Sequence, residues 1–583
     1  MLSLKKHKVF WGPSPFAREP SVVLTLSVQP AAFDGIERHI AHLSDLTRSW
    51  FNGCPEDEDG LRRIAQFVTQ WSAALLNEMS GNLKCNFSLS ENTDIFLVIG
   101  FHHPRVSVRA VELCCSFLTS GERLTPDNLD RALQSFWRLC ERHHPDWQAQ
   151  FLIDYCAQNE IPYFRFAARY WQFGWGKKSS VFFESQPMSD SSLGVRWGSN
   201  KLFAKQIFAQ MGAPVVKHAI VNSIPALKNA VNEVGFPCVI KPTDSSRSRG
   251  VTTNIDSEEK LLEAYRQATQ ISKSIMLEQH IPGQLHRIMV VRGKLWRIIV
   301  REQPYVIGDG KQSVLALTHD YNMRIDATAS PGSFIGSIPI DVDFDQVLKR
   351  AGYDRTSVPR AGTKVYLQDI PLLSRGSQYT DVTNVAHPEI RMMSEMIAQK
   401  FGIDNCGLDF ITQDISQPVR VSGGAFIEVN STPGLRVPFM AGVNAEEIGR
   451  VTLGDLPGRI PVTLIIAEAS HLESIMPCLK RDPNSGWFCN NQIGIGEVEL
   501  ANNNSTVFSA VRSLLANTLL HSAAVVLTPS ELQTHGLPVD RVSVTVLYQA
   551  PEFDSGWNEV VNDASSHVVE ANDIDALVAH ITP

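Results

Sequence analysis

The sequence lacks the features that mark several common classes of protein. No apolar run approaches the ~20 residues that a membrane-spanning helix needs, and the basic segment 1–10 has neither the apolar core nor the cleavage site of a signal peptide. The formal net charge of −8 argues against a protein that coats nucleic acid, because such binding needs excess positive charge. Ten cysteines without a C-x-x-C pair argue against a disulfide or zinc framework. We therefore expect a cytoplasmic protein with no membrane or nucleic-acid partner.

The length and composition predict a folded chain of several domains. At ~100–200 residues per domain, the 583 residues correspond to about three or four domains. A hydrophobic share of 43% and a charged share of 20% exclude bulk disorder. Strand and helix patterns alternate, so the expected fold class is multidomain, of α/β and α+β type. The pattern changes near Tyr163, and a Leu-Pro-Gly break follows Asp455, which predicts domains at 1–160, 161–455 and 456–583.

Hydrophobic periodicity predicts where the main elements lie. Strands are predicted at 22–28, 95–100, 236–240, 275–278, 287–291, 295–300, 407–411, 426–429, 462–466, 523–527 and 542–547. Helices are predicted at 61–79, 129–140, 201–211, 388–401 and 507–519, with one more after Ser223. Asp256 and Glu259 have the spacing of a capping box for a further helix. Two histidine pairs, at 102–103 and 143–144, have no carboxylate or Cys at ligand spacing, so we expect a surface or capping role rather than a metal site.

Two lysines and a loop of small residues form the first part of a chemical pattern. Lys201 and Lys241 are forty residues apart, and Lys241 stands between a predicted strand and the Ser-rich loop 243–250. Small residues let backbone N–H groups approach phosphate oxygens, and Arg247 and Arg249 add positive charge. The pattern favours a phosphate site.

Oxygen ligands form the second part of the pattern. Glu428 and Asn430 are two residues apart on a predicted strand, so their side chains face the same side. We expect Asp409 at the end of the neighbouring strand. One Asp, one Glu and one Asn supply the hard oxygen ligands that Mg²⁺ prefers. Arg436 follows a Pro-Gly turn, where we expect it to stabilise negative charge on a reacting carboxyl or phosphoryl group.

Each part alone is weakly specific, since a strand-end Lys is usually a solvated charge and a strand-end acid is usually a cap or a salt-bridge partner. The ordered set is more specific, and it resembles the ATP-grasp ligases, in particular the cyanophycin synthetase family. The resemblance is carried by 239–251 (VIKPTDSSRSRGV), 286–291 (HRIMVV), 308–310 (GDG), 381–389 (DVTNVAHPE), 407–415 (GLDFITQDI) and 426–436 (FIEVNSTPGLR). It extends more weakly to 11–13 (WGP) and to 458–461 (GRIP).

The resemblance implies a central ATP-grasp fold with ATP and Mg²⁺ as cofactors. It also implies a role for each residue that matches a family motif. These residues are Lys201 and Lys241 for the ATP phosphates, Ser246, Arg249 and Gly250 for the phosphate loop, Glu278 and His280 for adenine at the hinge, Asp409, Glu428 and Asn430 for Mg²⁺, and Arg287 and Arg436 for the acyl-phosphate site.

The sequence departs from the family in three places. Its phosphate loop contains less Gly, and Leu285 stands where the family tends to have an acidic residue near the ribose. The third departure is the tail, where the family continues into a Mur-ligase-like domain with a G-x-x-x-x-G-K-[ST] phosphate loop. Here 467–474 (AEASHLES) follows the first strand of that region instead. We interpret 456–583 as a truncated, non-catalytic Mur-ligase-like α/β domain that serves packing or oligomer contact.

The expected function is an ATP-dependent carboxylate–amine ligase that acts through an acyl phosphate on amino-acid or peptide substrates. One possibility, suggested by the short cyanophycin synthetases, is polymerisation of β-aspartyl-arginine dipeptides at a single site. A second is an amino-acid ligase of a peptide natural-product pathway. A third, of another class, is an inactive ATP-binding assembly subunit. The family also suggests a homo-oligomer.

Overall fold

The chain divides into two compact units. The computed structural model describes residues 2–29, 32–51, 53, 60–80, 83–90, 94–120, 124–243, 250–328, 336–368, 376–504 and 506–581, without the side chains of 79–80 and 326–328. Unit 1 contains Met1–Val181 and Asp455–Pro583, and unit 2 contains Phe182–Gly454. The three-domain division stays a prediction. No helix in the described ranges is long and apolar enough to cross a bilayer.

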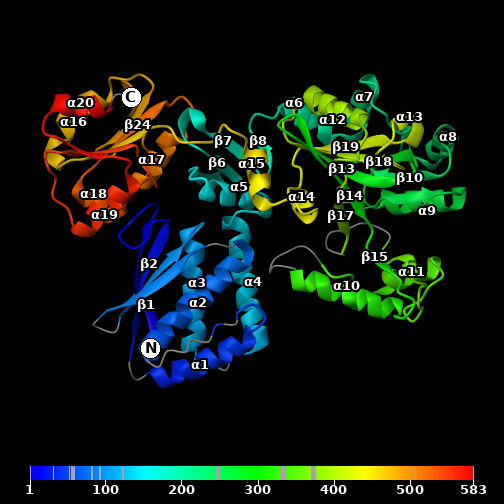
Figure 1. Cartoon of the computed structure of the whole chain (residues 1–583), viewed down its shortest axis with the longest axis horizontal. Helices are drawn as coiled ribbons and strands as arrows, with labels where there is room; N and C mark the ends of the chain where they lie inside the picture. The colour runs from blue at the N-terminus through cyan, green and yellow to red at the C-terminus, as the bar shows by residue number, and fades with distance from the viewer. Residues whose placement is uncertain are drawn as a thin grey trace. The chain divides into compact units, whose positions relative to one another are not determined.

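Unit 1 begins with an antiparallel sheet in the order β1-β2-β4-β3 (Figure 1). Its strands are β1 (Leu2–Phe10), β2 (Ser21–Val28), β3 (Cys85–Leu89) and β4 (Asp94–Gly100), and its helices are α1 (Phe33–Leu46), α2 (Gly60–Ser80), α3 (Pro104–Thr119), α4 (Pro126–His143) and α5 (Trp147–Gln158). α2 and α3 pack on this sheet and on each other. The face of α2 predicted from its periodicity is buried at Ile64, Phe67, Trp71 and Leu75.

The C-terminal part of unit 1 is a seven-stranded mixed sheet in the order β23-β22-β21-β24-β20-β25-β26. Its strands are β20 (Val462–Ile466), β21 (Ser485–Cys489), β22 (Gln492–Ile495), β23 (Val498–Leu500), β24 (Ser522–Leu527), β25 (Val544–Tyr548) and β26 (Val568–Ala571). Its helices are α16 (Leu472–Leu479), α17 (Val507–Leu515), α18 (Pro529–His535), α19 (Ser555–Ala564) and α20 (Ile574–Ile581). β20 and β24 run parallel and are buried along their length, as predicted for a parallel sheet. α17 ends at Leu515, before the predicted position 519. The chain turns after it, and the side-chain oxygen of Asn517 accepts a hydrogen bond from the backbone N–H of Leu519.

Unit 2 contains two antiparallel sheets. The small sheet has the order β11-β10-β12-β9 and the large sheet the order β17-β14-β13-β18-β19. The strands of the small sheet are β9 (His218–Val221), β10 (Cys238–Pro242), β11 (Thr252–Ile255) and β12 (Ile275–Gln279), and those of the large sheet are β13 (Gln284–Val291), β14 (Lys294–Glu302), β17 (Gln378–Asp381), β18 (Cys406–Thr412) and β19 (Ala425–Asn430).

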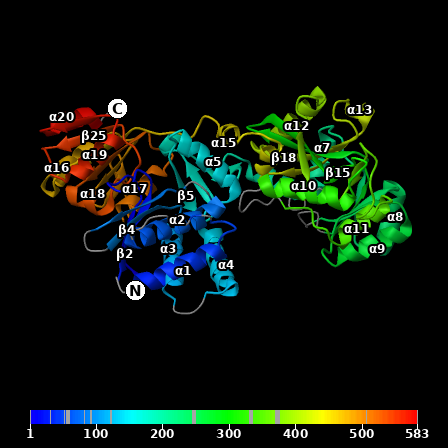
Figure 2. The same ribbon diagram turned by 60° about the horizontal axis from the view of Figure 1, so that its bottom comes forward.

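Helices of unit 2 cover both sheets. α8 and α9 pack on the small sheet, α12 packs on β13 and β14, and α7 packs on β19 (Figures 1 and 2). The helices are α6 (Ser192–Ser199), α7 (Lys201–Gln210), α8 (Ile224–Val234), α9 (Glu258–Thr269), α10 (Val314–Thr328), α11 (Val342–Arg350), α12 (Pro388–Phe401), α13 (Val419–Ser422), α14 (Arg436–Met440) and α15 (Ala445–Leu453). The remaining strands of the chain are β5 (Tyr163–Ala167), β6 (Tyr170–Phe173), β7 (Ser180–Phe183), β8 (Gln186–Pro187), β15 (Tyr305–Ile307) and β16 (Lys364–Tyr366).

Three local predictions in unit 2 need correction. The strand predicted at 236–240 is β10, which starts two residues later because its pairing with β12 begins at Cys238. The helix expected to start with an Asp256 capping box is capped by Ser257, whose hydroxyl accepts the Lys260 N–H, while Asp256 forms an ion pair with the Lys260 ammonium instead. Asp409 lies in the middle of β18 and not at its end. The predicted helix α12 is confirmed from Pro388 to Phe401.

We expect Gly194→Ala to destabilise unit 2 strongly. Gly194 lies in α6, and a Cβ there would stand 1.6 Å from the carbonyl oxygen of Phe401, which is the last residue of α12. Because that contact is with backbone, we predict a loss of about 2 kcal/mol or more in the free energy of unfolding. Urea denaturation measures it. Gly198→Ala in the same helix is the matched control, since its Cβ would meet Val429 at ordinary van der Waals distances. Equal effects of the two variants would contradict the prediction.

Candidate active site

Three strands of the large sheet bring charged side chains together. Arg287 on β13 is directly opposite Asp409 on β18, and Asp409 is directly opposite Glu428 on β19. Directly opposite residues of antiparallel strands point to the same face. Asn430, two residues beyond Glu428, is opposite Gly407 and faces the same side. The fold therefore assembles three predicted metal ligands and one predicted catalytic arginine on one sheet face.

These side chains are in direct contact. The Nε of Arg287 lies 2.9 Å from the Oδ1 of Asp409, and the Nδ2 of Asn430 donates a hydrogen bond of 3.1 Å to the Oε1 of Glu428. The Arg287 and Asp409 atoms are close enough for an ion pair, yet each is buried and neither makes a hydrogen bond of good geometry. Buried polar atoms with unused hydrogen-bonding capacity are rare and often mark functional sites.

The pKa values of the two carboxyl groups are shifted in opposite directions. Burial raises the pKa of Asp409 to about 6, although Arg287 opposes the shift. Burial also acts to raise the pKa of Glu428, but hydrogen bonds from the Asp409 carboxyl and from Asn430 bring that pKa below its usual value. A pair of carboxyls with pKa values pushed apart is typical of a site that binds a cation or moves a proton.

Arg301 belongs to the same site and was not found by the sequence analysis. It lies on β14, two residues from Ile299, which is opposite Arg287, so Arg301 and Arg287 face the same side. Burial and the neighbouring Arg287 lower the pKa of Arg301, and its buried Nε has no hydrogen-bond partner in the described structure. Two adjacent, partly desolvated guanidinium groups favour an anion between them. A sequence signal existed, because Arg301 directly follows the apolar run Ile298–Val300 of β14.

The small sheet carries a second charged cluster. Glu278 on β12 is opposite Val239, so Lys241, two residues further along β10, is its diagonal neighbour on the same face. The Nζ of Lys241 lies 2.7 Å from the Oε2 of Glu278. The Nζ of Lys205, on α7, lies 3.1 Å from the Oε1 of the same carboxylate. All three side chains are buried.

Lys205 is the second residue that the sequence analysis missed. It follows Lys201 by four residues on α7, so both lysines lie on one helix face. Burial lowers the pKa of Lys205, and the charge of Glu428 on the large sheet opposes that shift. The charge of Lys201 in turn helps to lower the pKa of Glu428. α7 therefore places lysines within electrostatic reach of both charged clusters.

The remaining predicted site residues have these positions. Gly250 has φ +74°, and a Cβ there would lie 2.6 Å from Ile271 and 3.0 Å from Pro242, so only Gly fits. Ser246 and Arg249 lie outside the described residues. The His280 N–H donates to the carbonyl of Pro237, and burial lowers the pKa of His280. Arg436 is the first residue of α14.

No group of three His, Cys, Asp or Glu side chains within the described ranges is arranged to hold a metal ion. The predicted Mg²⁺ set of Asp409, Glu428 and Asn430 differs from such a group because it combines two carboxylates with an amide. The two histidine pairs do come together, with ring centroids 4.1 Å apart for His103 and His143. Burial and nearby cations lower the pKa of His103 to about 4, so the surroundings disfavour a bound cation.

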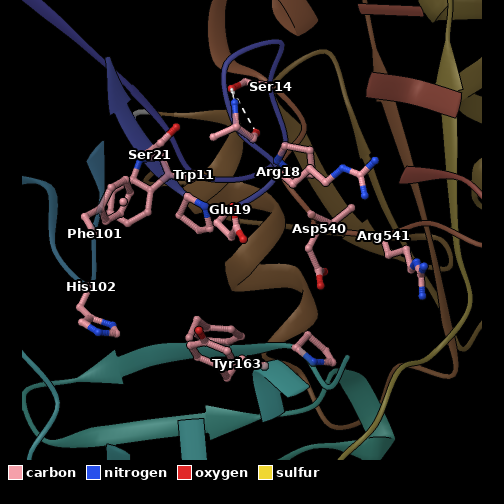
Figure 3. Close-up of a pocket in the computed structure, with 18 of the residues that line it drawn as sticks. Trp11, Ser14, Arg18, Glu19, Ser21, Phe101, His102, Tyr163, Asp540 and Arg541 are labelled. Carbon is pink, nitrogen blue, oxygen red and sulfur yellow. Dashed lines mark hydrogen bonds between the residues drawn. The ribbon is translucent and has the colours of Figure 1, made fainter. Parts of the chain in front are cut away.

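A large cavity in unit 1 is lined by none of the predicted site residues. Its volume is about 1810 Å³. Figure 3 shows the loop with Ser14, Arg18 and Glu19 on one side of it and Tyr163 on the opposite side. Most of its charged side chains are paired with each other, in the ion pairs Arg18–Asp563, Lys84–Glu19, Arg459–Asp540 and Arg541–Glu160. The predicted site residues that the structure describes are all in unit 2.

Comparison with known proteins supports the pattern found in the sequence. The cyanophycin synthetase of Nostoc sp. is 33% identical over 330 residues, which is 56% of this chain and 36% of the relative. That of Synechocystis sp. is 29% identical over 366 residues, 61% of this chain and 42% of the relative. The chain is similar to cyanophycin synthetases. The resemblance predicted from the motifs is thereby confirmed, while the chain spans only about two fifths of the length of these relatives.

Three further likenesses accompany this one. A family model described as the D-ala D-ala ligase C-terminus matches residues 207–304, a range that includes Lys241, Glu278, Arg287 and Arg301. The glutathione biosynthesis bifunctional protein GshAB of Clostridium perfringens is 25% identical over 246 residues, 41% of this chain and 31% of the relative. A solved bifunctional glutathione synthetase from Pasteurella multocida superposes with a TM-score of 0.40 at 20% identity, over 56% of this chain and 46% of that one.

The raised pKa of Asp409 predicts a pH-dependent stability effect. Its folded pKa of about 6 exceeds the ordinary value of 3.8, so its contribution to stability is present below pH ~3.8 and is lost as the pH rises through about 6. Asn does not titrate. We therefore expect the unfolding free energy of Asp409→Asn minus that of the wild type to rise by about 1–3 kcal/mol between pH 4 and pH 8. Urea denaturation across this range measures it, and a flat or falling difference would contradict the prediction.

Proposed function

We propose that this chain is an ATP-dependent carboxylate–amine ligase of the ATP-grasp type, which joins amino acids or peptides through an acyl phosphate. The observation that carries the proposal is the pair of buried charged clusters in unit 2. One contains Lys241 and Glu278 on the small sheet, and the other contains Arg287, Asp409 and Glu428 on the large sheet. Similarity to cyanophycin synthetases supports it, as does the D-ala D-ala ligase match over 207–304, which includes Lys241, Glu278 and Arg287.

The large-sheet cluster fits Mg²⁺ by the chemistry of its donors. Asp409, Glu428 and Asn430 offer oxygen ligands on one face of the sheet, and a bound divalent cation would stabilise the ionised form of both carboxyls. These three residues would hold the ion. When bound, Mg²⁺ would neutralise triphosphate charge.

The small-sheet cluster and its surroundings fit the nucleotide. Lys201 and Lys241 would contact ATP phosphates, and the absence of a side chain at Gly250 would let its backbone approach them. Ser246 and Arg249 are proposed for the same loop, and Glu278 and His280 for the adenine end. The carboxylate of Glu278 already contacts two lysines, which supports a role in ordering those lysines.

The proposed chemistry has two steps. A substrate carboxylate oxygen forms a bond to the γ-phosphorus of ATP, and the bond from that phosphorus to the β,γ-bridging oxygen breaks to release ADP. An amine then attacks the acyl carbon, the C–O bond to phosphate breaks, and a proton leaves the nitrogen. Arg287, Arg301 and Arg436 would stabilise the negative charge that develops on the transferred phosphoryl group and on the acyl oxygen.

The substrate class proposed is an amino acid or peptide, with cyanophycin-type peptide formation as the first candidate because the relatives at 29–33% identity carry that name. A single-site polymerase of β-aspartyl-arginine dipeptides and an amino-acid ligase of a natural-product pathway are the narrower alternatives. We further propose that 456–583 is a non-catalytic, Mur-ligase-like domain and that the chain forms a homo-oligomer.

The proposed function predicts that Glu428→Gln abolishes ligation. The variant removes one anionic oxygen ligand and should lower turnover by about 100-fold or more. The measurement is phosphate release from ATP with a panel of amino acids, dipeptides and a cyanophycin primer, followed by mass spectrometry of the products.

Glu473→Gln, the same change on α16 of unit 1, is the matched control and should retain wild-type turnover. If the wild type releases no phosphate and forms no product with any member of the panel, the proposed ligase activity fails. If Glu428→Gln turns over normally, the metal-ligand assignment fails.

Arg301 provides a separate prediction about the reacting groups. Arg301→Lys keeps a positive charge but loses the planar guanidinium that binds oxyanions in a bidentate manner. We expect kcat to fall by about tenfold to 100-fold with the affinity for a slowly hydrolysed ATP analogue changed by less than about threefold. Steady-state kinetics and calorimetry measure the two quantities. Arg266→Lys on the exposed face of α9 is the control, and an equal loss there would refute a specific role.

A further inference from the structure

Lys205 is a buried lysine to which the motif pattern gives no role. Its side chain has no solvent exposure, and its only ion-pair partner in the described structure is Glu278, at 3.1 Å. Lys241 contacts the other oxygen of the same carboxylate at 2.7 Å. A fully buried ammonium group is costly, because desolvation removes its hydration energy and only a partner of opposite charge offsets that loss.

The three charges leave a positive excess in the site. Glu278 carries one negative charge, while Lys205 and Lys241 carry two positive ones. Without Lys205, Glu278 and Lys241 would form a neutral pair, and the charge of Lys241 would be directed at the carboxylate. With Lys205 on the other oxygen, the cluster keeps one net positive charge in a region where electrostatic interactions are little screened.

We propose that Lys205 is a positioning residue of the nucleotide site: by pairing with Glu278, it leaves the ammonium group of Lys241 available to a phosphate group. The inference rests on the proposed ATP-dependent function and adds a residue to it. Lys205 acts through Glu278 and does not itself need to touch the ligand.

The local charges agree with this role. Burial lowers the pKa of Lys205, and Glu278 opposes that shift more than any other group does. Burial also acts to raise the pKa of Glu278, but Lys241 and Lys205 together bring it below its usual value, so the carboxylate stays ionised. The neighbouring charges that act on Lys205 are Glu278, Lys241 and Glu428, and Lys241 is the one that repels it. An incoming phosphate would relieve that repulsion.

The first test compares ligands with and without phosphate. Calorimetry of the full chain with Mg²⁺ and a slowly hydrolysed ATP analogue should show at least a tenfold loss of affinity in Lys205→Met, because the cluster becomes neutral. Binding of adenosine, which has no phosphate, should be unchanged. Lys228→Met, an exposed lysine on α8 that pairs with Glu258, should bind both ligands like the wild type.

The decisive test is a double-mutant cycle with Glu278→Gln. If Lys205 acts through Glu278, Lys205→Met should change analogue affinity by less than about threefold when Glu278→Gln is already present, although it costs at least about tenfold in the otherwise wild-type chain. The ratio of analogue affinity to adenosine affinity is compared in all four proteins, which removes any effect of Glu278 on adenine. A purely structural role of Lys205 would give the same loss in both backgrounds and for both ligands.

The outcomes separate this inference from the proposed function. If the wild type does not bind the analogue, the proposed function fails and this inference fails with it. If the wild type binds and Lys205→Met binds equally well, only the role of Lys205 is overturned. If urea denaturation shows that Lys205→Met alone does not fold, the comparison of Glu278→Gln with the double variant decides: equal analogue affinity supports the role, and a tenfold loss overturns it.

Discussion

Unit 2 depends on the burial of charged side chains in mutually compensating sets. Glu278 is buried between two ammonium groups, and Asp409 is buried against Arg287. Removing one partner from such a set typically costs about 3–5 kcal/mol, because the remaining charge is left without compensation in a medium that solvates it poorly. Well-packed apolar side chains would stabilise the same positions at least as well. Retaining charge there makes sense only if it serves binding or catalysis.

The strand register explains how these sets are held in place. Arg287, Asp409 and Glu428 are directly opposite one another on three adjacent strands. Their spacing is therefore fixed by the hydrogen bonds of the sheet and does not depend on the conformation of a loop. Sites built on strands are more rigid than sites built on loops. The close contact of α6 with the end of α12 at Gly194 belongs to the same scaffold, since α6 leads directly into α7 and its lysines.

The residues that the sequence revealed are those whose relation is local. The spacing of Glu428 and Asn430 predicts that their side chains share one face of a strand. The pattern from Pro388 to Phe401 predicts both ends of α12 correctly. Lys205 could not be assigned from sequence, because its partner Glu278 is 73 residues away and the pairing exists only after α7 packs in unit 2. Arg301 was missed for a similar reason, since its neighbour Arg287 is across a hairpin. Asp256 lost its predicted capping role because the adjacent Ser257 offers the helix an equivalent oxygen acceptor one residue later.

The charged side chains around the unit 1 cavity and those on the large sheet of unit 2 differ in their exposure to water. Four ion pairs around the unit 1 cavity match acid to base and are partly or well exposed, so water screens them and each contributes little. On the large sheet of unit 2, buried side-chain atoms of Arg287, Asp409 and Arg301 retain unused hydrogen-bonding capacity, as do buried polar atoms of unit 1 such as those of Glu78 and Asp146. Unused capacity in a buried place costs stability, and a ligand that satisfies it regains that cost on binding. Arg287 and Arg301 lie within the region matched by the D-ala D-ala ligase model, and Asp409 is on the strand that pairs with β13, so the large-sheet cluster is partly inside and partly outside that match.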